Sequence, residues 1–512
     1  MNINTGELLA HRAMLSPNKV GLTCEGRNYT FLDLNRRANR AAHALEALGV
    51  RPGDRVALLA RSGVEYYDLF FGLGKIGGIL VPVNHRLAPV EVAEIMEDAG
   101  ARVLIYGAEF AGVVETIKSE TLLFRPVRIG EGPGPGEAYE ELLAKANVKE
   151  PMIEAVNDDA LAIIYAVWAM GRPRGAMLTH ENFFWSSLTI MATLILTGQP
   201  HLLALPLFHI GGLAWLPTYI HQGKRCVLMP RFEPDRFLAL LQSEGVTAFG
   251  VVPTMLHFLK ESPAFAGCDF SRVQCILSYG QALPVPLIEE YARAGIRVRN
   301  LYGLTESAGP ALVIDAEHAL AKAGSVGLPF FHTRVNLVDD HGEEVNKGAV
   351  GEVIIAGDHV MKGYWNQPEA TADAIRGGWL YTGDLARRDE DGYYYIMDRK
   401  KELVISGGEN ISPAQIEDVL MAHPAVADVA VLGYPDQVWG ELLKAVVVRK
   451  PGAELTPEGL IAWCKGRIAD YKVPKKVEFQ DSLPRTQAGK MEKKRLREAV
   501  SRLFPKKNRA GQ

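Results

Sequence analysis

The stretch of sequence from Arg55 to Val83 reads RVALLARSGVEYYDLFFGLGKIGGILVPV. Two short apolar runs, Arg55–Ala60 and Ile79–Val83, predict strands, and the segment Glu65–Lys75 between them predicts a helix. A strand, a helix and a second strand in this order form a crossover unit with parallel strands. The apolar runs do not alternate with polar residues, as expected for strands covered on both faces.

The same alternation of short apolar runs and amphipathic segments continues as far as Tyr302. It predicts further strands at Arg102–Tyr106, Leu161–Ala166, His201–Leu205, Arg225–Met229, Thr247–Val252, Cys275–Ser278 and Val298–Tyr302. Helical patterns lie between most of these strands, which favours an α/β fold with mostly parallel sheets flanked by helices.

The pattern changes near Gly324 and again near Asp398. Short strands joined by turns predict a small barrel or sheet, at Gly324–Gly327, Arg334–Asp339, Gly351–Ala356 and Gly392–Met397. A compact α+β pattern follows, in which a capping box at Ser412–Gln415 and a similar start at Thr456 begin helices. We predict a large N-terminal domain with a small β-barrel-like subdomain at 1–397, a smaller mobile α+β C-terminal lid at 398–505, and a basic tail at 506–512.

Length and composition exclude several classes of protein. The 512 residues exceed one core of ~100–200 residues, and a net charge of −4 argues against a nucleic-acid partner. The five cysteines are scattered without metal-ligand spacing, as expected for a cytoplasmic chain. No signal peptide is visible, and no apolar run reaches the ~20 residues that span a bilayer. Whether the chain forms a homo-oligomer stays open.

Two polar segments follow predicted strands. Gly171–Gly175 (GRPRG) is either a plain turn or a glycine-rich strand–helix loop whose amides face a phosphate. In Tyr302–Glu306 (YGLTE), Thr305 and Glu306 either hold a phosphate-bound Mg²⁺ or form a helix N-terminus with Thr305 as its cap.

Further polar clusters lie nearer the C-terminus. Tyr381–Asp384 (YTGD) and Asp398–Lys401 (DRKK) are either turns with surface charges or a carboxylate and a guanidinium that hold ribose hydroxyls. Lys490, which ends Pro484–Lys490 (PRTQAGK), is either a surface lysine or a point charge for a transferring phosphoryl group. The basic stretch from Lys472 onward is either a solvated face with a loose tail or a site for a phosphate-bearing ligand.

The order of these segments resembles the adenylate-forming superfamily, and most closely its acyl-CoA synthetase branch. The resemblance extends over nearly the whole chain. It rests on GRPRGAMLTH at Gly171–His180, LPLFHIGG at Leu205–Gly212, NLYGLTE at Asn300–Glu306, GEVIIAGDHVMKGYWNQPEAT at Gly351–Thr371, GWLYTGD at Gly378–Asp384, DRKKELVISGGENISPAQIE at Asp398–Glu417 and PRTQAGK at Pro484–Lys490.

This resemblance implies a ligase that uses ATP, Mg²⁺ and coenzyme A. A carboxylic acid would first attack the α-phosphate of ATP to give an acyl-adenylate and pyrophosphate, and the CoA thiolate would then displace AMP. Mg²⁺ and a lysine would help the carboxylate approach the negatively charged phosphates of ATP. The lid would swing between the two half-reactions.

The resemblance also implies roles for individual residues. The catalytic residues would be Lys490, Thr305, Glu306 and His209, with Glu306 as the Mg²⁺ ligand and His209 where the acyl and pantetheine channels join. Nucleotide and CoA contacts would come from Gly171, Arg174, Gly175, Gly280, Gln281, Ala282, Tyr302, Gly303, Asp384, Arg399, Ser406, Gly407, Gly408, Lys472 and Lys475. The acyl pocket would include His209, Tyr279, Gly280 and Leu304, and Lys401 would be the hinge.

The chain departs from the family pattern at two places. The family's phosphate loop usually reads YTSGTTGxPKG, whereas Tyr165–Gly175 reads YAVWAMGRPRG, so four hydroxyl positions, one glycine and the lysine are replaced. Each hydrogen bond to a charged group is worth ~1.5–3 kcal/mol, so we expect the ATP step to be weakened. Tyr279 stands where a small residue is usual; it either narrows the acyl pocket, which favours a short or slim acid, or turns into the core.

Two other functions remain open at this point. The altered loop favours a non-catalytic homologue that binds nucleotide or CoA, whereas the retained Lys490 opposes it. The second alternative function is that of an enzyme that acts on an acyl-CoA or a pre-formed acyl-adenylate without ATP. The sequence identifies neither the acid nor the pathway. It also does not show whether the altered loop is engineered or natural.

Overall fold

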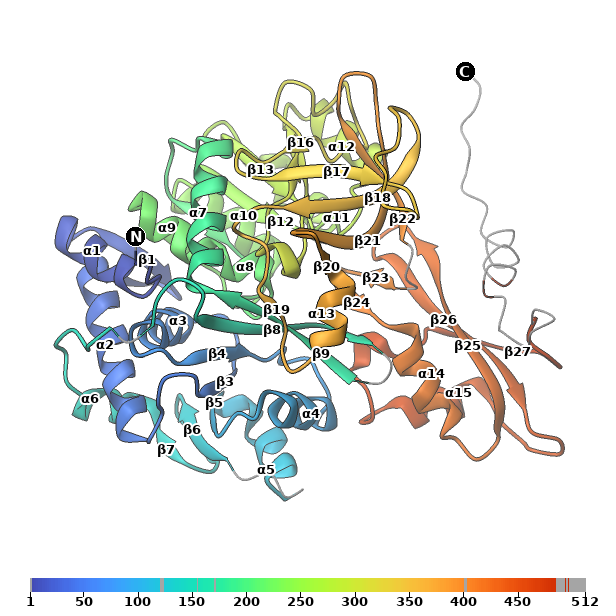
Figure 1. The fold of residues 1–512 in the computed structure, drawn as a ribbon, viewed down its shortest axis with the longest axis horizontal. Helices are drawn as coiled ribbons and strands as arrows, with labels where there is room; N and C mark the ends of the chain where they lie inside the picture. Colours follow the sequence, from blue (N-terminus) through green and yellow to red (C-terminus); the bar gives the residue numbers. More distant parts are fainter. Residues whose placement is uncertain are drawn as a thin grey trace. The chain divides into compact units, whose positions relative to one another are not determined.

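The computed structural model describes residues 2–119, 124–153, 155–169, 172–399, 403–484, 493 and 496, and Figure 1 shows it as a ribbon. The chain divides into two compact units. The first contains the residues up to His85, then Ile95–Ala166 and Gly175–Lys400; the second contains Arg86–Glu94, Val167–Arg174 and the residues after Lys400. No helix among the described residues is long and apolar enough to cross a membrane.

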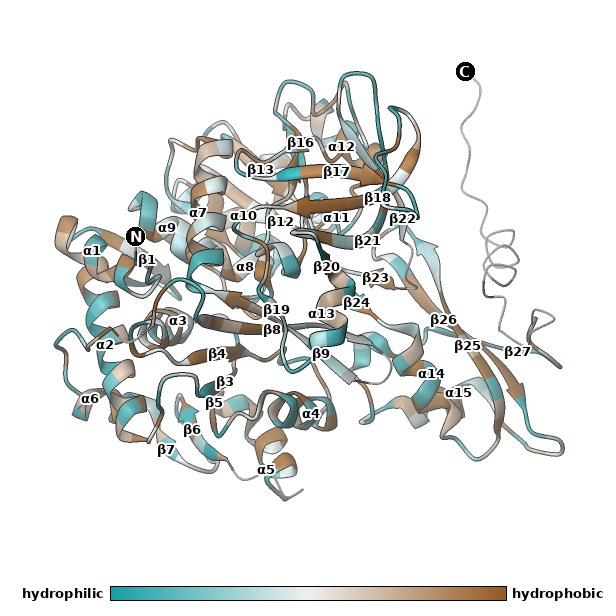
Figure 2. Cartoon of the chain, viewed as in Figure 1, coloured by the Kyte–Doolittle hydropathy of each residue, from teal (hydrophilic) through white to brown (hydrophobic). Residues whose placement is uncertain are grey.

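The stretch that predicts a crossover unit forms one. β3 (Arg55–Leu59), α3 (Val64–Ile76) and β4 (Ile79–Pro82) follow one another, and the two strands pair in parallel. Each residue of α3 except Glu65 is classed as buried, because α2 (Phe31–Ala47) packs against it. Both strands are buried along most of their length, as the unbroken apolar runs predicted, and Figure 2 shows β4 in the brown of hydrophobic residues.

The sheet that contains this unit has eight strands. Their order is β19 (Gly363–Tyr364), β9 (Arg172–Thr179), β8 (Ala160–Ala169), β4, β3, β5 (Val103–Gly107), β6 (Arg125–Ile129) and β7 (Glu137–Ala138). The prediction of a strand–helix turn at Gly171–Gly175 is wrong for residues 172–175. These residues belong to β9, and the next helix, α7 (His180–Leu194), begins only after this strand ends.

A second sheet of the first unit has nine strands. Their order is β16 (Leu328–Pro329), β15 (Leu312–Val313), β14 (Val298–Tyr302), β13 (Cys275–Ser278), β12 (Ala248–Val251), β10 (His201–Leu203), β11 (Cys226–Leu228), β1 (Val20–Cys24) and β2 (Arg27–Thr30). The strand predicted at Gly324–Gly327 is wrong, because Gly327 has a φ of 86° and forms only an isolated bridge with Tyr394.

The other helices that precede residue 400 connect and cover the strands. They are α1 (Glu7–Leu15), α4 (Pro89–Ala99), α5 (Ala111–Ser119), α6 (Tyr139–Lys145), α8 (Ile210–Leu213), α9 (Trp215–Gln222), α10 (Pro234–Ser243), α11 (Pro253–Glu261), α12 (Val285–Arg293) and α13 (Pro368–Ala374). A five-stranded antiparallel sheet completes this unit, in the order β17 (Arg334–Val338), β18 (Val350–Ala356), β21 (Trp379–Arg388) and β20 (Ile375–Arg376), with β22 (Tyr394–Arg399) also paired to β21.

The second unit has its own sheet and core. β24 (Glu409–Ile411), β23 (Val404–Ser406), β26 (Gly440–Arg449) and β25 (Val426–Asp436) lie in this order, and β27 (Lys476–Phe479) also pairs with β26. Helices α14 (Pro413–Met421) and α15 (Pro457–Cys464) pack beside them. Both begin with proline as predicted, but Ser412 makes no side-chain capping bond, so the capping box expected there is wrong.

A polar contact links the start of α7 to the loop at residues 358–360. Asn182 lies in the first turn of α7, and its side chain completes a capping box with Thr179. The same side chain donates hydrogen bonds of 2.8 Å to the carbonyl oxygens of Asp358 and Val360. Asn182 is buried, and its amide group thus provides a donor to each of these two carbonyl groups away from water.

We expect Asn182→Ala to lower the free energy of unfolding by about 2 kcal/mol, because it removes a cap and leaves two carbonyl groups without these donors. Urea denaturation followed by fluorescence measures the effect. Thr179→Ser keeps the cap and serves as the control, with a loss of less than about 0.5 kcal/mol. Equal stability of Asn182→Ala and the unmodified chain would contradict the importance of this contact.

Candidate functional site

Polar segments follow the carboxyl ends of neighbouring parallel strands. β12, β13 and β14 pair in parallel, so their carboxyl ends lie along the same edge of the sheet. Residues 279–282 leave this edge after β13, and residues 303–306 leave it after β14. Open α/β sheets bind ligands outside the carboxyl ends of their strands, so this edge is the candidate functional site.

The turn after β14 requires a glycine. A Cβ atom at position 303 would overlap the carbonyl oxygen of Gly309, because the chain folds back on itself there. The Leu304 amide donates to the Ser307 hydroxyl, and residues 305–307 form one short 3₁₀ turn. Leu304, not Thr305, occupies the capping position, so the alternative in which Thr305 caps a helix is wrong.

Two of the predicted nucleotide contacts meet directly. The Tyr302 hydroxyl, at the end of β14, donates a 2.6 Å hydrogen bond to Oδ2 of Asp384 on β21. Asp384 is only 2% exposed, and its amide donates to the Thr382 hydroxyl. Arg399 is the register partner of Asp384 across β21 and β22, although its side chain lies outside the described part. The carboxylate therefore has a fixed orientation at the strand edge.

Glu306 is held by a second phenol. The Tyr364 hydroxyl donates to Glu306 Oε1 at 2.7 Å, and the Glu306 carbonyl oxygen accepts a 2.8 Å bond from the Met361 amide. Tyr364 belongs to β19, which pairs with β9. Thr305, beside Glu306, is 9% exposed. Both oxygen-bearing side chains predicted for the phosphate and Mg²⁺ contacts therefore stand next to each other at this turn.

A buried histidine supports the same turn. The two ring nitrogens of His359 lie 2.9 Å from the Ser307 carbonyl oxygen and 2.7 Å from the Thr333 hydroxyl. Because a carbonyl can only accept, Nδ1 carries the proton and Nε2 accepts from the hydroxyl. Burial lowers the pKa of His359 to about 4, so the neutral ring is the form that maintains both bonds near neutral pH.

Tyr279 packs beside the segment that carries His209. His209 is half-buried and precedes α8. The Tyr279 hydroxyl donates to the carbonyl oxygen of Gly211 at 2.9 Å and accepts from Trp215 Nε1 at 3.1 Å. Tyr279 is 8% exposed, and burial raises the pKa of its phenol. The side chain is therefore packed into the interior, as one of the two alternatives for Tyr279 predicted.

The other residues predicted after β13 are accessible. Gly280 has a φ of 81°, which favours glycine, and Gly280 and Ala282 are exposed, whereas Gln281 is half-buried. They follow Tyr279 directly, so a ligand at the strand edge can reach the backbone of this segment.

The segment that departs from the family pattern forms two strands. Gly175 is buried in β9, where its carbonyl oxygen accepts a 2.8 Å bond from the Trp365 amide and an added Cβ would lie 2.5 Å from Ile163. This glycine therefore serves packing within the sheet. Arg174 is half-buried, and Gly171 lies outside the described residues.

In the second unit, the predicted CoA contacts lie at a tight turn and near α14. Ser406, Gly407 and Gly408 are half-buried at the turn between β23 and β24, where both glycines have a positive φ, 57° and 87°. Lys475 is exposed, but Lys472 is 2% exposed. The Lys472 ammonium binds Glu91 and Gln415, so contact with a CoA phosphate would require these bonds to open. Lys401 and Lys490 lie outside the described residues.

The described residues contain no group of three or more histidine, cysteine, aspartate or glutamate side chains that could hold a metal ion. A Mg²⁺ ion that is bound together with a nucleotide needs few protein ligands, because phosphate oxygens and water provide the others. The Glu306 carboxylate offers the hard oxygen atoms that Mg²⁺ prefers. The hydrogen bond from Tyr364 holds its orientation. The turn at Glu306 therefore fits a Mg²⁺ ion shared with a phosphate.

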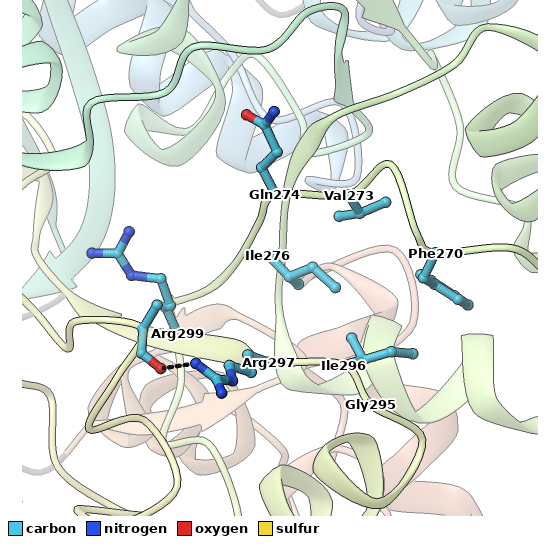
Figure 3. Close-up of a pocket in the computed structure, with 9 residues that line it drawn as sticks. Phe270, Val273, Gln274, Ile276, Gly295, Ile296, Arg297 and Arg299 are labelled. Atoms are coloured by element: carbon cyan, nitrogen blue, oxygen red, sulfur yellow. Dashed lines mark hydrogen bonds between the residues drawn. The ribbon is translucent and has the colours of Figure 1, made fainter.

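A hollow of about 270 Å³ lies elsewhere in the first unit. Figure 3 shows Arg297 and Arg299 towards one side of it, Phe270 at the other side and Ile276 between them. Except for Ala316, its lining residues precede or begin β13 and β14, at the edge opposite to the carboxyl ends of these strands. Both arginines donate to backbone carbonyls, of Ala316 and Ile314, so they serve to hold the 314–316 segment.

Several supporting residues escaped sequence reasoning. Tyr364 and His359 lie within a stretch that matches the family pattern, but only the folded chain brings them to Glu306 and Ser307. Trp215 carried no sequence signal beyond its place after Leu205–Gly212. The glycine pattern Gly211-Gly212 beside His209 was the available signal for close packing near Tyr279.

Comparison with known proteins identifies the two parts of the chain. Residues 9–365 match the family of AMP-binding enzymes, and residues 415–490 match the AMP-binding enzyme C-terminal domain. A feruloyl-CoA synthase from Amycolatopsis sp is 39% identical, over 97% of this chain and 99% of the relative. A long-chain-fatty-acid–CoA ligase from Mycobacterium tuberculosis is 38% identical, over 98% of this chain and 100% of the relative.

The fold is also that of solved structures. An o-succinylbenzoate CoA synthetase from Bacillus subtilis, a double mutant with a bound product analogue, superposes with a TM-score of 0.86 at 32% identity, covering 97% of this chain and 98% of the other. An amide bond synthetase from Marinactinospora thermotolerans has a TM-score of 0.87 at 28% identity, covering 96% and 99%. The predicted α/β fold with a smaller C-terminal domain is confirmed.

We expect His359→Gln to become more stable, relative to the unmodified chain, as the pH falls. The pKa of His359 is lowered from 6.5 to about 4, so its stabilising contribution is complete above pH 6.5 and is lost as the pH falls towards 4. Glutamine can make both hydrogen bonds and does not titrate. The difference in free energy of unfolding should shift by about 2 kcal/mol between pH 7.5 and 5, as measured by urea denaturation. A difference independent of pH would contradict the neutral, buried ring.

Proposed function

Because this chain belongs to the AMP-binding enzyme family, we propose that it is an AMP-forming ligase that joins a carboxylic acid to coenzyme A. Its relatives activate an acid as an acyl-adenylate and then form the CoA thioester. Solved relatives contain AMP or an acyl-adenylate. ATP and coenzyme A are thus substrates of the reaction, and Mg²⁺ accompanies the nucleotide.

The contact between Tyr302 and Asp384 is the observation that carries the proposal for this chain. It places a buried carboxylate, oriented by a 2.6 Å hydrogen bond, at the edge where strands of an α/β sheet bind ligands. A carboxylate can accept from both hydroxyls of a ribose. Together with the exposed backbone at Gly280, it would hold the nucleoside part of ATP or of an acyl-adenylate.

The phosphate end of the site would lie at Thr305 and Glu306. A Mg²⁺ ion bound there would neutralise charge as the carboxylate of the acid approaches the α-phosphate. Glu306 would provide an oxygen ligand, and the Thr305 hydroxyl would donate to phosphate. Lys490 and Arg399, by their place in the family pattern, would provide the cationic partners. His209 would lie between the acyl group and the pantetheine arm.

We further propose that the ATP step is slow in this chain. The positions from Ala166 to Met170 lack the hydroxyl groups that bind the β- and γ-phosphates in the family pattern, and Trp168 replaces a glycine. Loss of several hydrogen bonds to charged oxygens costs several kcal/mol, at ~1.5–3 kcal/mol each. Binding of AMP, acyl-adenylate and CoA does not use these bonds and would be retained.

The first test measures pyrophosphate release from MgATP across short, branched, aromatic and long carboxylic acids. We expect slow release with one class of acid. Restoring Thr-Ser-Gly-Thr-Thr at residues 166–170 should increase it by about 100-fold or more, since ~1.4 kcal/mol corresponds to a factor of ten. Fast release by the unmodified chain, with no gain from restoration, would contradict the weakened ATP step while establishing the ligase.

A second measurement separates the other functions. Synthetic acyl-AMP mixed with coenzyme A should give the thioester and AMP without ATP. A chain that forms the thioester but never releases pyrophosphate would be an enzyme that acts on a pre-formed adenylate. A chain that binds AMP and CoA but supports neither reaction would be a non-catalytic homologue.

We expect Tyr364→Phe to weaken the Mg²⁺-dependent binding of ATP by about tenfold. The phenol donates to the Glu306 carboxylate, and such hydrogen bonds to charged groups contribute ~1.5–3 kcal/mol. Calorimetric titration with ATP, with and without Mg²⁺, measures the effect. Tyr393→Phe is the matched control, because its hydroxyl donates to Asp315 instead. Equal losses in both variants would exclude a specific role of Tyr364.

A further inference from the structure

We infer that Ser62 and His85 are positioning residues for His209, and that they fix its loop for the thioester-forming step. The inference rests on the proposed ligase function, in which His209 lies between the acyl group and the pantetheine arm. The loop of His209 follows β10 of the nine-stranded sheet, whereas Ser62 and His85 follow strands of the eight-stranded sheet. One sheet would thus position a reactive side chain that belongs to the other.

Three neighbouring strands of the eight-stranded sheet end at the same edge. β3 pairs in parallel with both β4 and β5, so the segments that follow these strands leave the sheet side by side. Ser62 follows β3, His85 follows β4, and Phe110 ends the short 3₁₀ turn that follows β5. Side chains at the carboxyl ends of parallel strands commonly face a ligand site. Here they contact the loop that carries His209.

A buried hydrogen bond joins this edge to the loop at residues 204–209, which leads from β10 to α8. The Leu207 amide donates to the Ser62 hydroxyl at 3.0 Å. Both residues are buried, so removing the hydroxyl would take this acceptor from an amide that is shielded from water. The bond therefore fixes the backbone two residues before His209.

Contacts between rings fix the next residue of the loop. The His85 ring meets the Phe208 ring edge to face, with centroids 5.1 Å apart and planes inclined by 88°. The Phe110 ring lies 5.4 Å from the His85 ring. Phe208 is buried and lies against His209, with centroids 4.5 Å apart and planes inclined by 54°. Because ring pairs prefer defined arrangements, a change at His85 would be passed through Phe208 to His209.

The His209 backbone leads directly into α8. Its carbonyl oxygen accepts hydrogen bonds from the amides of Gly212 and Leu213, at 3.0 and 2.9 Å. The helix thus sets the position of His209 on one side, and Leu207 and Phe208 set it on the other. This precision matters for catalysis, because displacing a reacting group by about 1 Å can lower a rate by about 100-fold.

The experiment measures thioester formation from coenzyme A and synthetic acetyl-, hexanoyl-, dodecanoyl- or benzoyl-AMP. It uses the full chain without ATP, and the variants are compared with the probe that the unmodified chain uses fastest. His85→Ala and Ser62→Ala should each lower kcat by about tenfold or more. The KM for CoA should change by less than about threefold, because the loop acts in the reaction of the bound complex.

A double-mutant cycle with His209→Ala tests whether the two residues act through His209. If they do, the loss caused by His85→Ala or Ser62→Ala should nearly disappear in the His209→Ala background, since residues that act as a unit are not additive. A purely structural loss would be equal in both backgrounds.

Conservative variants provide the matched controls. His85→Phe keeps a ring against Phe208, and Ser62→Thr keeps the hydroxyl that accepts from Leu207. Each should recover most of the rate that the corresponding alanine variant loses. Thermal unfolding checks that every variant is folded.

The outcomes distinguish this inference from the function on which it rests. Additive losses in the cycle, unchanged rates in the folded alanine variants, or no recovery in His85→Phe and Ser62→Thr would overturn the positioning role and leave the ligase proposal intact. Absence of a thioester with every probe in the unmodified chain would overturn the thioester-forming function and, with it, this inference.

Discussion

The structure of the candidate site depends on the parallel pairing of β12, β13 and β14. Parallel strands place their carboxyl ends at one edge, so segments separated by tens of residues in the sequence leave the sheet side by side. The turn after β14 then folds back so tightly that position 303 accepts only glycine. This constraint sets the positions of Thr305 and Glu306 relative to Tyr302, and hence of the carboxylates on which the proposed chemistry depends.

Neutral side chains make several of the contacts that support this edge. Tyr302 donates to Asp384, Tyr364 to Glu306, and His359 binds the Ser307 carbonyl. The two phenols orient the carboxyl groups of Asp384 and Glu306 without adding a positive charge, and the imidazole holds a backbone carbonyl of the same turn.

Aromatic side chains pack beside the segment that carries His209. Tyr279, Trp215 and Tyr219 form a buried series from the end of β13 to α9. The Tyr279 ring has few alternative positions, because its hydroxyl makes two hydrogen bonds.

Much of the fold could be predicted from the sequence. The unbroken apolar runs at β3 and β4 marked strands covered on both faces, and the ordered motifs indicated the family over nearly the whole chain. Local pattern failed where a distant segment decides the conformation. Gly327 has a positive φ and lies against the backbone of Val313, a contact that the local sequence does not reveal. Arg172–Gly175 form a strand because they pair within the sheet instead of starting a helix.

The sequence by itself determined the alternation of strands and helices, the family, and the residue types available for ATP, Mg²⁺ and an acid, because these depend on composition, periodicity and order along the chain. The tertiary structure decided which of those residues meet. It placed Tyr364 against Glu306, buried Lys472 against Glu91 within the second unit, and turned Tyr279 into a slot between two glycines. Contacts between residues far apart in sequence arise only when sheets and helices pack, and no local pattern records them.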